Sequence, residues 1–215
     1  WVMPETRLVA SLAKAISADG RFIAFASDAT NLVSGMTHTT GEYYVPLRDV
    51  FLYDAVDGSI RLLSVSSANP SVTANGDSTD PSISADGSRV VFLSTATDLV
   101  GGQVDGDSTR DVFLFDSAAS GSAVQMVSRV QGTTATAGNG EAASPVLSAD
   151  GRFVAFESLA TNLVGDASHD TNGGSDVFLY DVSGQSLQLV SHARGTTTTA
   201  ADGASTSPSI SADGS

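Results

Sequence analysis

The stretch ISADGRFIAFASDATNLV, residues 16–33, decides the fold because the chain repeats it. It returns as LSADGRFVAFESLATNLV at 147–164 and, with more changes, as ISADGSRVVFLSTATDLV at 83–100. A fourth copy begins at residue 210 with ISADGS. The four S-A-D-G tetrapeptides therefore recur about every 65 residues, and self-similarity at a fixed period is typical of repeat architectures.

Each repeat contains four short segments that are typical of β-strands. The second segment, RFIAF in the first copy, consists of β-branched and aromatic residues and follows an Asp-Gly turn. The third is DVFLYD or DVFLFD, and Asp-Gly or Ser-Gly turn residues follow it in two copies, which favours a hairpin. The other segments are P-S-I-S (81–84, 208–211) or P-V-L-S (145–148) before S-A-D-G, and SIRLLSV (59–65), AVQMVSR (123–129) and SLQLVSH (186–192) at the end.

Units of four antiparallel strands in tandem, with no helical periodicity between them, predict an all-β fold of the β-propeller type. We expect three full blades with flanking single strands. The expected boundaries are 1–15 for an outer strand of a preceding blade (TRLVAS, 6–11) with a linker, 16–66, 81–130 and 145–192 for the blades, and 207–215 for the start of a fourth.

The motif P-x-[IL]-S-A-D-G-x-x-[IV]-x-F followed by D-V-F-x-x-D resembles the TolB-type, WD-like propeller repeats of bacterial proteins. The resemblance covers nearly the whole chain. It departs from that family in having Ile or Leu where Trp often precedes the turn, and in a unit longer than the ~40–45 residues of WD-type blades. The resemblance implies a propeller that can accompany a hydrolase domain and screen its substrates.

Three blades are too few to close a ring, since propellers have about four to eight. We therefore expect the sequence to be part of a longer propeller, or several chains to complete one ring. The former is favoured because the last inner strand lacks its following strands.

The composition argues against several classes of partner. Acidic residues outnumber Lys and Arg by 24 to 10, and the net charge is −14, so neither nucleic acid nor an acidic membrane surface is an expected partner. No apolar run is long enough for membrane insertion. The absence of cysteine excludes disulfides and thiolate ligands, and the acidic, lysine-poor, Ser/Thr-rich sequence favours an extracellular or periplasmic bacterial protein.

The loops before DVFLFD and DVFLYD in blades 2 and 3 contain acidic residues with the pattern D-x-[DN]-x-x-x-D. Carboxylate and amide oxygens at this spacing in a Gly-rich loop suit calcium, although the closing Glu of an EF-hand is absent. The candidate ligands are Asp105, Asp107 and Asp111 in blade 2, and Asp166, Asp170, Asn172 and Asp176 in blade 3. Turn formation by Asp and Asn is the alternative, and blade 1, which keeps only Asp49, indicates a structural role for the last Asp of each set.

The corresponding loop of blade 1 is longer and contains Tyr43, Tyr44, Val45 and Pro46. Tyrosine is frequent at interfaces because it combines a large rigid surface with a polar tip, so these residues are a candidate partner site. Packing of the same residues over the blade edge is the alternative. Both interpretations remain open.

No catalytic constellation is recognisable in the sequence. It lacks a G-x-S-x-G elbow and an H-E-x-x-H motif, and His38, His169 and His192 fall in different loops or at a strand end. We therefore expect a non-enzymatic module that binds a protein or a carbohydrate, stabilised by calcium. The alternatives are the propeller portion of a larger hydrolase, and a structural subunit joined to others through open blade edges.

Overall fold

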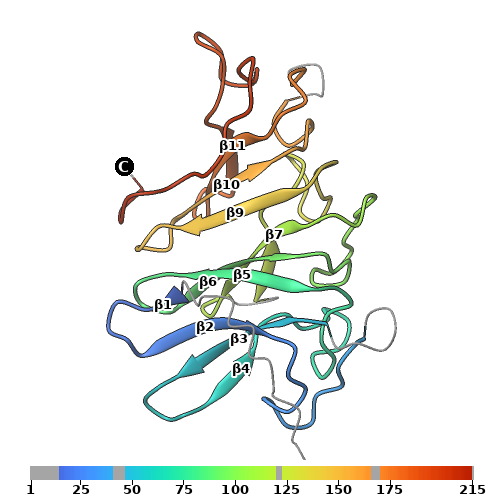
Figure 1. Ribbon diagram of the computed structural model, residues 1–215, viewed down its shortest axis with the longest axis vertical. Coiled ribbons are helices and arrows are strands. Elements are labelled where there is room, and N and C mark those ends of the chain that lie inside the picture. Colours follow the sequence, from blue (N-terminus) through green and yellow to red (C-terminus); the bar gives the residue numbers. More distant parts are fainter. Residues whose placement is uncertain (1–14, 41–46, 120–122, 166–169, 215) are drawn as a thin grey trace, which may run out of the picture.

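The computed structural model describes residues 15–40, 47–119, 123–165 and 170–214. In these ranges the chain forms twelve β-strands and no helix, and therefore no helix that could cross a bilayer. The strands make three four-stranded antiparallel sheets, each in chain order, which follow one another along the molecule from blue through green to orange (Figure 1). We call these sheets blades 1, 2 and 3. The all-β fold class with an open set of propeller-type blades is thus confirmed.

The strand bounds repeat from blade to blade. Blade 1 consists of β1 (Ala15–Ile16), β2 (Phe22–Ser27), β3 (Asp49–Asp54) and β4 (Ile60–Leu62). Blade 2 consists of β5 (Ser78–Ile83), β6 (Arg89–Ser94), β7 (Asp111–Asp116) and β8 (Val124–Met126). Blade 3 consists of β9 (Ala142–Leu147), β10 (Phe153–Ser158), β11 (Asp176–Asp181) and β12 (Ser186–Leu189).

The strand expected at 208–211 does not form among the described residues. A strand exists only through a hydrogen-bonded ladder to a neighbour, and no described strand pairs with this segment. The earlier TRLVAS segment lies outside the described residues. The first strand of each sheet is also longer than P-S-I-S where proline is present, since β5 and β9 begin upstream of it, whereas β1 has only two residues.

Blade 2 is buried on both faces, and its sequence shows why. On one face Val90, Phe92 and Phe113 join the hydrophobic cluster shared with blade 1. On the other, Val91 and Leu114 join the cluster shared with blade 3. Successive residues of a strand point to opposite faces, so a strand between two blades must be apolar at every position. The continuous runs VVFL (90–93) and VFLF (112–115) meet that requirement.

The S-A-D-G tetrapeptides are tight turns closed by their own aspartate. In blade 2 the Asp86 Oδ1 accepts hydrogen bonds from Ser84 Oγ (2.6 Å) and from the Ser88 backbone N–H (2.9 Å). Asp19 and Asp150 accept the equivalent bonds in the other blades. These hydrogen bonds favour the ionised form and lower the pKa of all three carboxyls. The recurring aspartate is therefore a turn-former.

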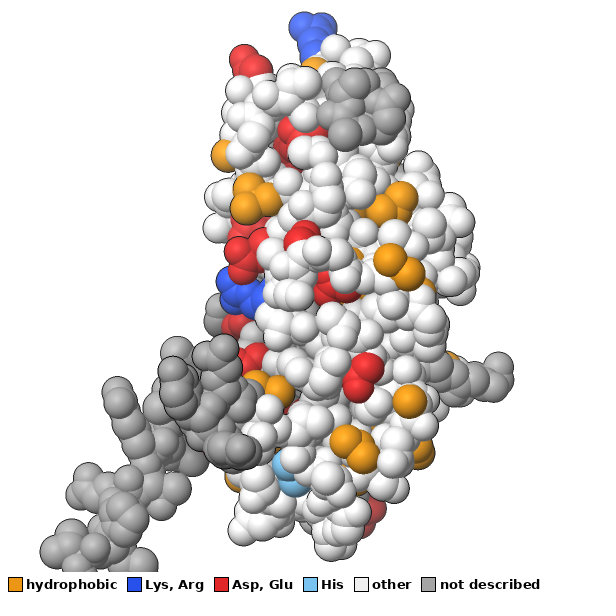
Figure 2. Space-filling model, turned by 90° about the vertical axis from the view of Figure 1, so that its right-hand side faces the viewer, with side chains coloured by type: hydrophobic (Ala, Val, Ile, Leu, Met, Phe, Trp, Pro, Cys, Tyr) orange, Lys and Arg blue, Asp and Glu red, His pale blue; other side chains and the backbone are white. Residues whose placement is uncertain are grey.

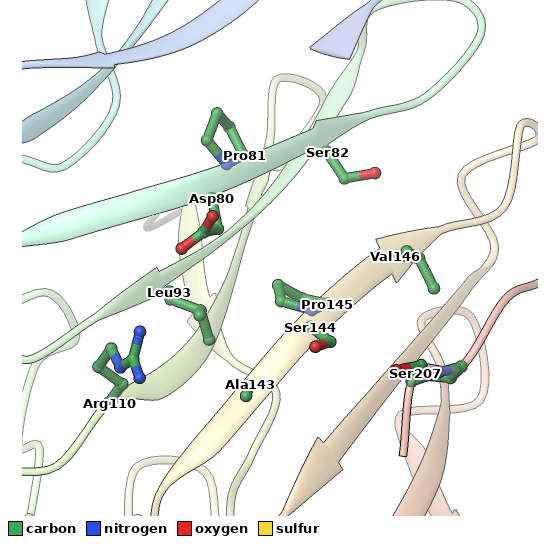
Figure 3. Close-up of a pocket in the computed structure, with 11 residues that line it drawn as sticks. Asp80, Pro81, Ser82, Leu93, Arg110, Ala143, Ser144, Pro145, Val146 and Ser207 are labelled. Atoms are coloured by element: carbon green, nitrogen blue, oxygen red, sulfur yellow. The ribbon is translucent and has the colours of Figure 1, made fainter. Parts of the chain in front are cut away.

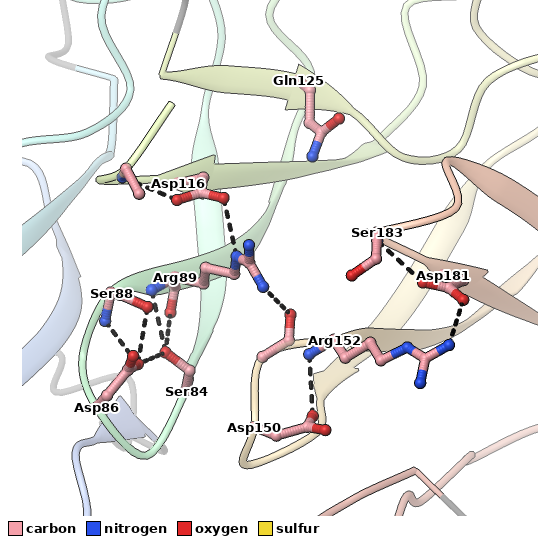
Figure 4. A network of polar contacts seen from close by, with 12 residues as sticks. Ser84, Asp86, Ser88, Arg89, Asp116, Gln125, Asp150, Arg152, Asp181 and Ser183 are labelled. Carbon is pink, nitrogen blue, oxygen red and sulfur yellow. Dashed lines mark hydrogen bonds and ion pairs between the residues drawn. The ribbon is translucent and has the colours of Figure 1, made fainter. Parts of the chain in front are cut away.

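The same turns connect the blades to one another. The Ala18 N–H donates to the carbonyl of Ala85 (2.8 Å), and the Ala85 N–H donates to the carbonyl of Ala149 (2.7 Å). The Asp150 N–H in turn donates to the carbonyl of Ala212 (3.0 Å), in the fourth S-A-D-G tetrapeptide. Arg89 adds a side-chain link, because it pairs with Asp116 in its own blade and donates to the Gly151 carbonyl of the next (Figure 4).

We call the first strand of each blade its inner strand. A second set of backbone hydrogen bonds joins neighbouring blades at the end of this strand that is farther from the S-A-D-G turn. The first residues of β5 and β9 donate their N–H groups to the residue before the third strand of the preceding blade, Ser78 to Arg48 and Ala142 to Arg110, both at 2.8 Å. Ser205 makes the same bond to Ser175 (2.7 Å). β5 and β9 are thus each fixed to the preceding blade at both ends.

The turn glycines offer a matched test of this packing. Gly20 and Gly87 share a left-handed φ of 74°, but a Cβ added to Gly20 would meet nothing, whereas one added to Gly87 would lie 2.2 Å from the Phe22 ring of blade 1. We expect Gly20→Ala to cost about 1–2 kcal/mol for the φ alone, and Gly87→Ala roughly 1–3 kcal/mol more for the displaced ring. Denaturant unfolding measures both. Equal losses would show that turn and ring are not packed as described.

Candidate functional site

A cavity of about 750 Å³ lies between the inner strands β5 and β9, and we call it the inner-strand cavity (Figure 3). Its polar lining comprises Asp80, Ser82, Arg110, Ser144 and Ser207, and its apolar lining includes three prolines. The volume falls within the ~300–1,000 Å³ usual for ligand pockets. The inner-strand cavity is therefore large enough for a small ligand or for a short segment of a partner chain.

Three residues that line this cavity have an unusual backbone conformation: one in β5, one in β9 and one in the segment that follows β12. Asp80, Ser144 and Ser207 have φ values of 51°, 51° and 58°, and each precedes a proline. A left-handed non-glycine residue is uncommon, and the position before proline restricts the backbone further. In β5 and β9 the ladder to the second strand shifts register at or opposite this point, so the strand bulges.

Charged groups of both signs surround the cavity. Glu157 accepts a hydrogen bond from Ser144 Oγ (2.5 Å) and one from the backbone N–H of Ser207 (3.3 Å), and so links the β9 bulge to the segment before Pro208. Arg110 donates from Nε to Glu141 Oε1 (2.7 Å). These contacts keep polar side chains in fixed positions around the cavity, which is what orients a ligand.

A second recurring arrangement lies at the start of the third strand of each blade. Asp49, Asp111 and Asp176 are almost fully buried, with 1–2% of their surface exposed. In each blade a serine hydroxyl donates to the aspartate Oδ1 and accepts the N–H of the following valine. The Ser Oγ–Asp Oδ1 distances are 2.8 Å for Ser64, 2.7 Å for Ser128 and 2.7 Å for Ser191. The hydroxyl thus satisfies a carboxylate and a backbone donor at once.

Burial dominates the ionisation of these aspartates. Burial raises the pKa of Asp49 and of Asp111 to about 7, against the lowering effect of the serine bond. Asp105 and Asp107 raise the pKa of Asp111 further. The pKa of Asp176 is also raised by burial, and the charge of Asp170 acts in the same direction.

A loop residue faces the buried aspartate in each blade. In blade 1 it is His38, whose Nδ1 lies 3.6 Å from Asp49 Oδ2. Asp105 occupies the corresponding place in blade 2. The residue before His38, Thr37, forms a parallel bridge with Val72, and the residue before Asp105, Val104, forms the equivalent bridge with Thr136. In blade 3 Asp170 precedes Asp176 by the same interval as in blade 2. Asp105 and Asp170 each have one buried carboxylate oxygen without a hydrogen-bond partner, and so does Asp176.

The other predicted metal ligands have local partners or lie outside the described residues. Asp107 is exposed and accepts the Thr109 N–H (3.0 Å) and hydroxyl (2.8 Å), as a turn residue does. Asn172 accepts the Gly174 N–H and donates to the Ala201 carbonyl (2.7 Å), so its amide fixes the loop. Asp166 and the aromatic segment Tyr43, Tyr44, Val45 and Pro46 lie outside the described residues. Within the described ranges, no three His, Asp or Glu side chains gather as a metal-binding group.

Sequence reasoning missed two features of these sites. The bulges had a signal, the Asp80-Pro81 and Ser144-Pro145 dipeptides in the middle of β5 and β9. The serines also had one, since each lies 15–17 residues after its aspartate, but only the strand register shows that the two side chains meet. In blade 1 Ser64, Asp49 and His38 resemble a hydrolase triad in composition only, because the hydroxyl is bonded to the aspartate and its residue is fully buried.

No protein-family model and no curated protein matches the sequence. Among solved structures, the chain is similar to TolB from Acinetobacter baumannii, with 13% identity and a TM-score of 0.45 over 83% of this chain and 31% of that one. It is also similar to an oligogalacturonate lyase in complex with manganese, with 13% identity and a TM-score of 0.49 over 82% and 40%. For the tricorn protease the values are 13%, 0.44, 82% and 18%.

The chain therefore spans less than half of the length of each of these three proteins. A TolB protein is among them, as the resemblance of the repeats implied. At such identities the likeness concerns the arrangement of the strands, and what those proteins act on is not transferred to this chain.

The raised pKa of Asp111 has a consequence for stability. The folded protein holds this proton up to about pH 7, whereas the unfolded chain loses it near pH 4. The stabilisation is therefore complete below pH 4 and is lost as the pH rises through 7. With divalent cations chelated, we expect the free energy of unfolding of wild type to fall by on the order of 2–4 kcal/mol relative to that of Asp111→Asn as the pH rises from 4 to 7.5. Chemical unfolding of both proteins across this range measures it, and parallel stability curves would contradict it.

Proposed function

We propose that this chain is a non-enzymatic binding module that works outside the cytoplasm, and that its partner, a protein or a carbohydrate, is bound at the inner-strand cavity. The observation that carries the proposal is the left-handed backbone conformation that recurs before a proline at Asp80, Ser144 and Ser207. Backbone strain of this kind persists only where surrounding structure enforces it, and it clusters at functional sites. Here it recurs around one cavity.

The chemistry of the cavity suits a polar partner. Serine hydroxyls, one aspartate and one arginine offer donors and acceptors, while the prolines supply rigid apolar surface between them. Hydroxyl-rich sugars and peptide backbones both present groups of this kind. Anionic polymers are disfavoured by the net charge of −14.

The outer surface offers no competing docking patch on the face shown in Figure 2. On the face shown in Figure 2 acidic side chains are spread along the length of the molecule, and hydrophobic side chains stand singly or in small groups. Scattered apolar residues are ordinary on a soluble surface and form no docking patch on that face. A defined cavity is thus a better candidate for recognition than the face of Figure 2. The acidic, lysine-poor surface supports the extracellular or periplasmic location.

Filling the inner-strand cavity tests the proposal. Ala143 lines it, and Ala143→Trp places a large ring there, whereas Ser183→Trp adds the same ring at an exposed hairpin turn as a matched control. We expect the wild-type protein to bind members of a glycan array or of a peptide array. Ala143→Trp should weaken that binding at least tenfold, about 1.4 kcal/mol, and Ser183→Trp should not.

The outcome also separates the alternatives. Binding to glycans alone or to peptides alone identifies the class of partner. No binding to either array, or binding that Ala143→Trp leaves intact, would remove the inner-strand cavity as the site. Thermal unfolding of both variants verifies that they are folded.

A further inference from the structure

We propose that blade 3 contains a calcium site in which Asp170 and Asp176 bind the ion in the small cavity that both residues line. This inference does not depend on what the inner-strand cavity binds. The small cavity is about 10 Å³, which is room for one water-sized occupant. Its other walls include the apolar side chains of Leu163, Phe178 and Leu189.

The carboxylate oxygens of the two residues indicate a missing partner. Asp176 is 1% exposed, its Oδ1 accepts the Ser191 hydroxyl, and its Oδ2 accepts nothing. Asp170 likewise has a buried Oδ1 without a partner. A buried charged oxygen without a hydrogen bond or a cation is strongly unfavourable, and two of them that line one cavity are more so. A cation between them resolves both costs.

Blade 1 shows what replaces the cation when the loop residue changes. There His38, in the same loop, faces Asp49, so the acid is opposed by a base instead of a second acid. The aspartate and its serine are retained in both blades. The aspartate–serine pair therefore belongs to the fold, and the loop residue decides whether a cation is needed.

The ligand types favour calcium. Hard oxygen ligands suit Ca²⁺ and Mg²⁺, but Mg²⁺ demands near-ideal octahedral geometry, whereas Ca²⁺ accepts irregular geometry and bidentate carboxylates, which Asp170 and Asp176 can provide. Zinc is disfavoured because none of the residues lining the cavity is His or Cys. Thr161 and Thr198 also line it and add oxygen atoms at its edge.

Calcium titration of the whole chain tests the site. After dialysis against a chelator, isothermal titration with CaCl₂ gives the number of ions bound by wild type, by Asp170→Asn and by Asp49→Asn. We expect Asp170→Asn to bind one ion fewer per chain, and Asp49→Asn to bind as many as wild type. Counting ions keeps the result independent of any binding by the Asp105–Asp111 pair in blade 2.

Thermal unfolding supplies a second readout of opposite sign. In chelator, Asp170→Asn should melt at or above the wild-type temperature, because it removes repulsion between two carboxylates. In millimolar calcium it should melt below wild type, since a ligand that binds only the folded state stabilises it. Equal ion counts in wild type and Asp170→Asn would overturn the proposal. A wild type that binds no calcium would also overturn it, and would indicate that a proton shared by Asp170 and Asp176 relieves the repulsion between their carboxylates.

Discussion

The structure depends on the backbone hydrogen bonds that fix the inner strands β5 and β9 to the preceding blade at both of their ends. At one end the S-A-D-G turns bond to one another from Ala18 to Ala85 to Ala149. At the other, Ser78 and Ala142 bond to the residue before the preceding third strand. These bonds set the spacing at which the apolar faces of neighbouring blades meet. Because each is made by backbone atoms of a turn or strand end, they recur wherever the turn sequence recurs.

The two candidate sites follow from this attachment. An inner strand that is held at both ends must span a fixed distance. At the bulges containing Asp80 and Ser144, β5 and β9 accommodate one residue more than the neighbouring strand. The side chains at those bulges then line the inner-strand cavity. The residue before the third strand accepts an inter-blade bond, and the strand begins at the next residue with the buried aspartate. Both candidate sites therefore lie at positions that the attachment of the blades also uses, and the loop residue opposite the buried aspartate is His38 in blade 1 and an aspartate in blades 2 and 3.

Local features were predictable from the sequence, and features that depend on register were not. The strands, the D-G turns and the turn-forming role of Asp19 and Asp86 follow from residue type and spacing alone. That Asp111 would be buried against Ser128 depends on how β7 and β8 pair, which no spacing shows. The acidic loops were identified, but only the structure shows that Asp170 lines a cavity with Asp176, whereas the Asn172 amide donates to the Ala201 carbonyl in the connection after β12. The aromatic segment at 43–46 stays a prediction.

Native-state hydrogen exchange of the Ala85 amide is the most direct test of the backbone hydrogen bonds between the S-A-D-G turns of neighbouring blades. Ala85 lies in a partly exposed turn, where amides usually exchange quickly. Its N–H is nevertheless bonded to Ala149 across the interface between blades 2 and 3. We expect this amide to exchange as slowly as the central amides of β6 and β7. Its exchange should require global unfolding. Exchange at the rate of an open loop would contradict it.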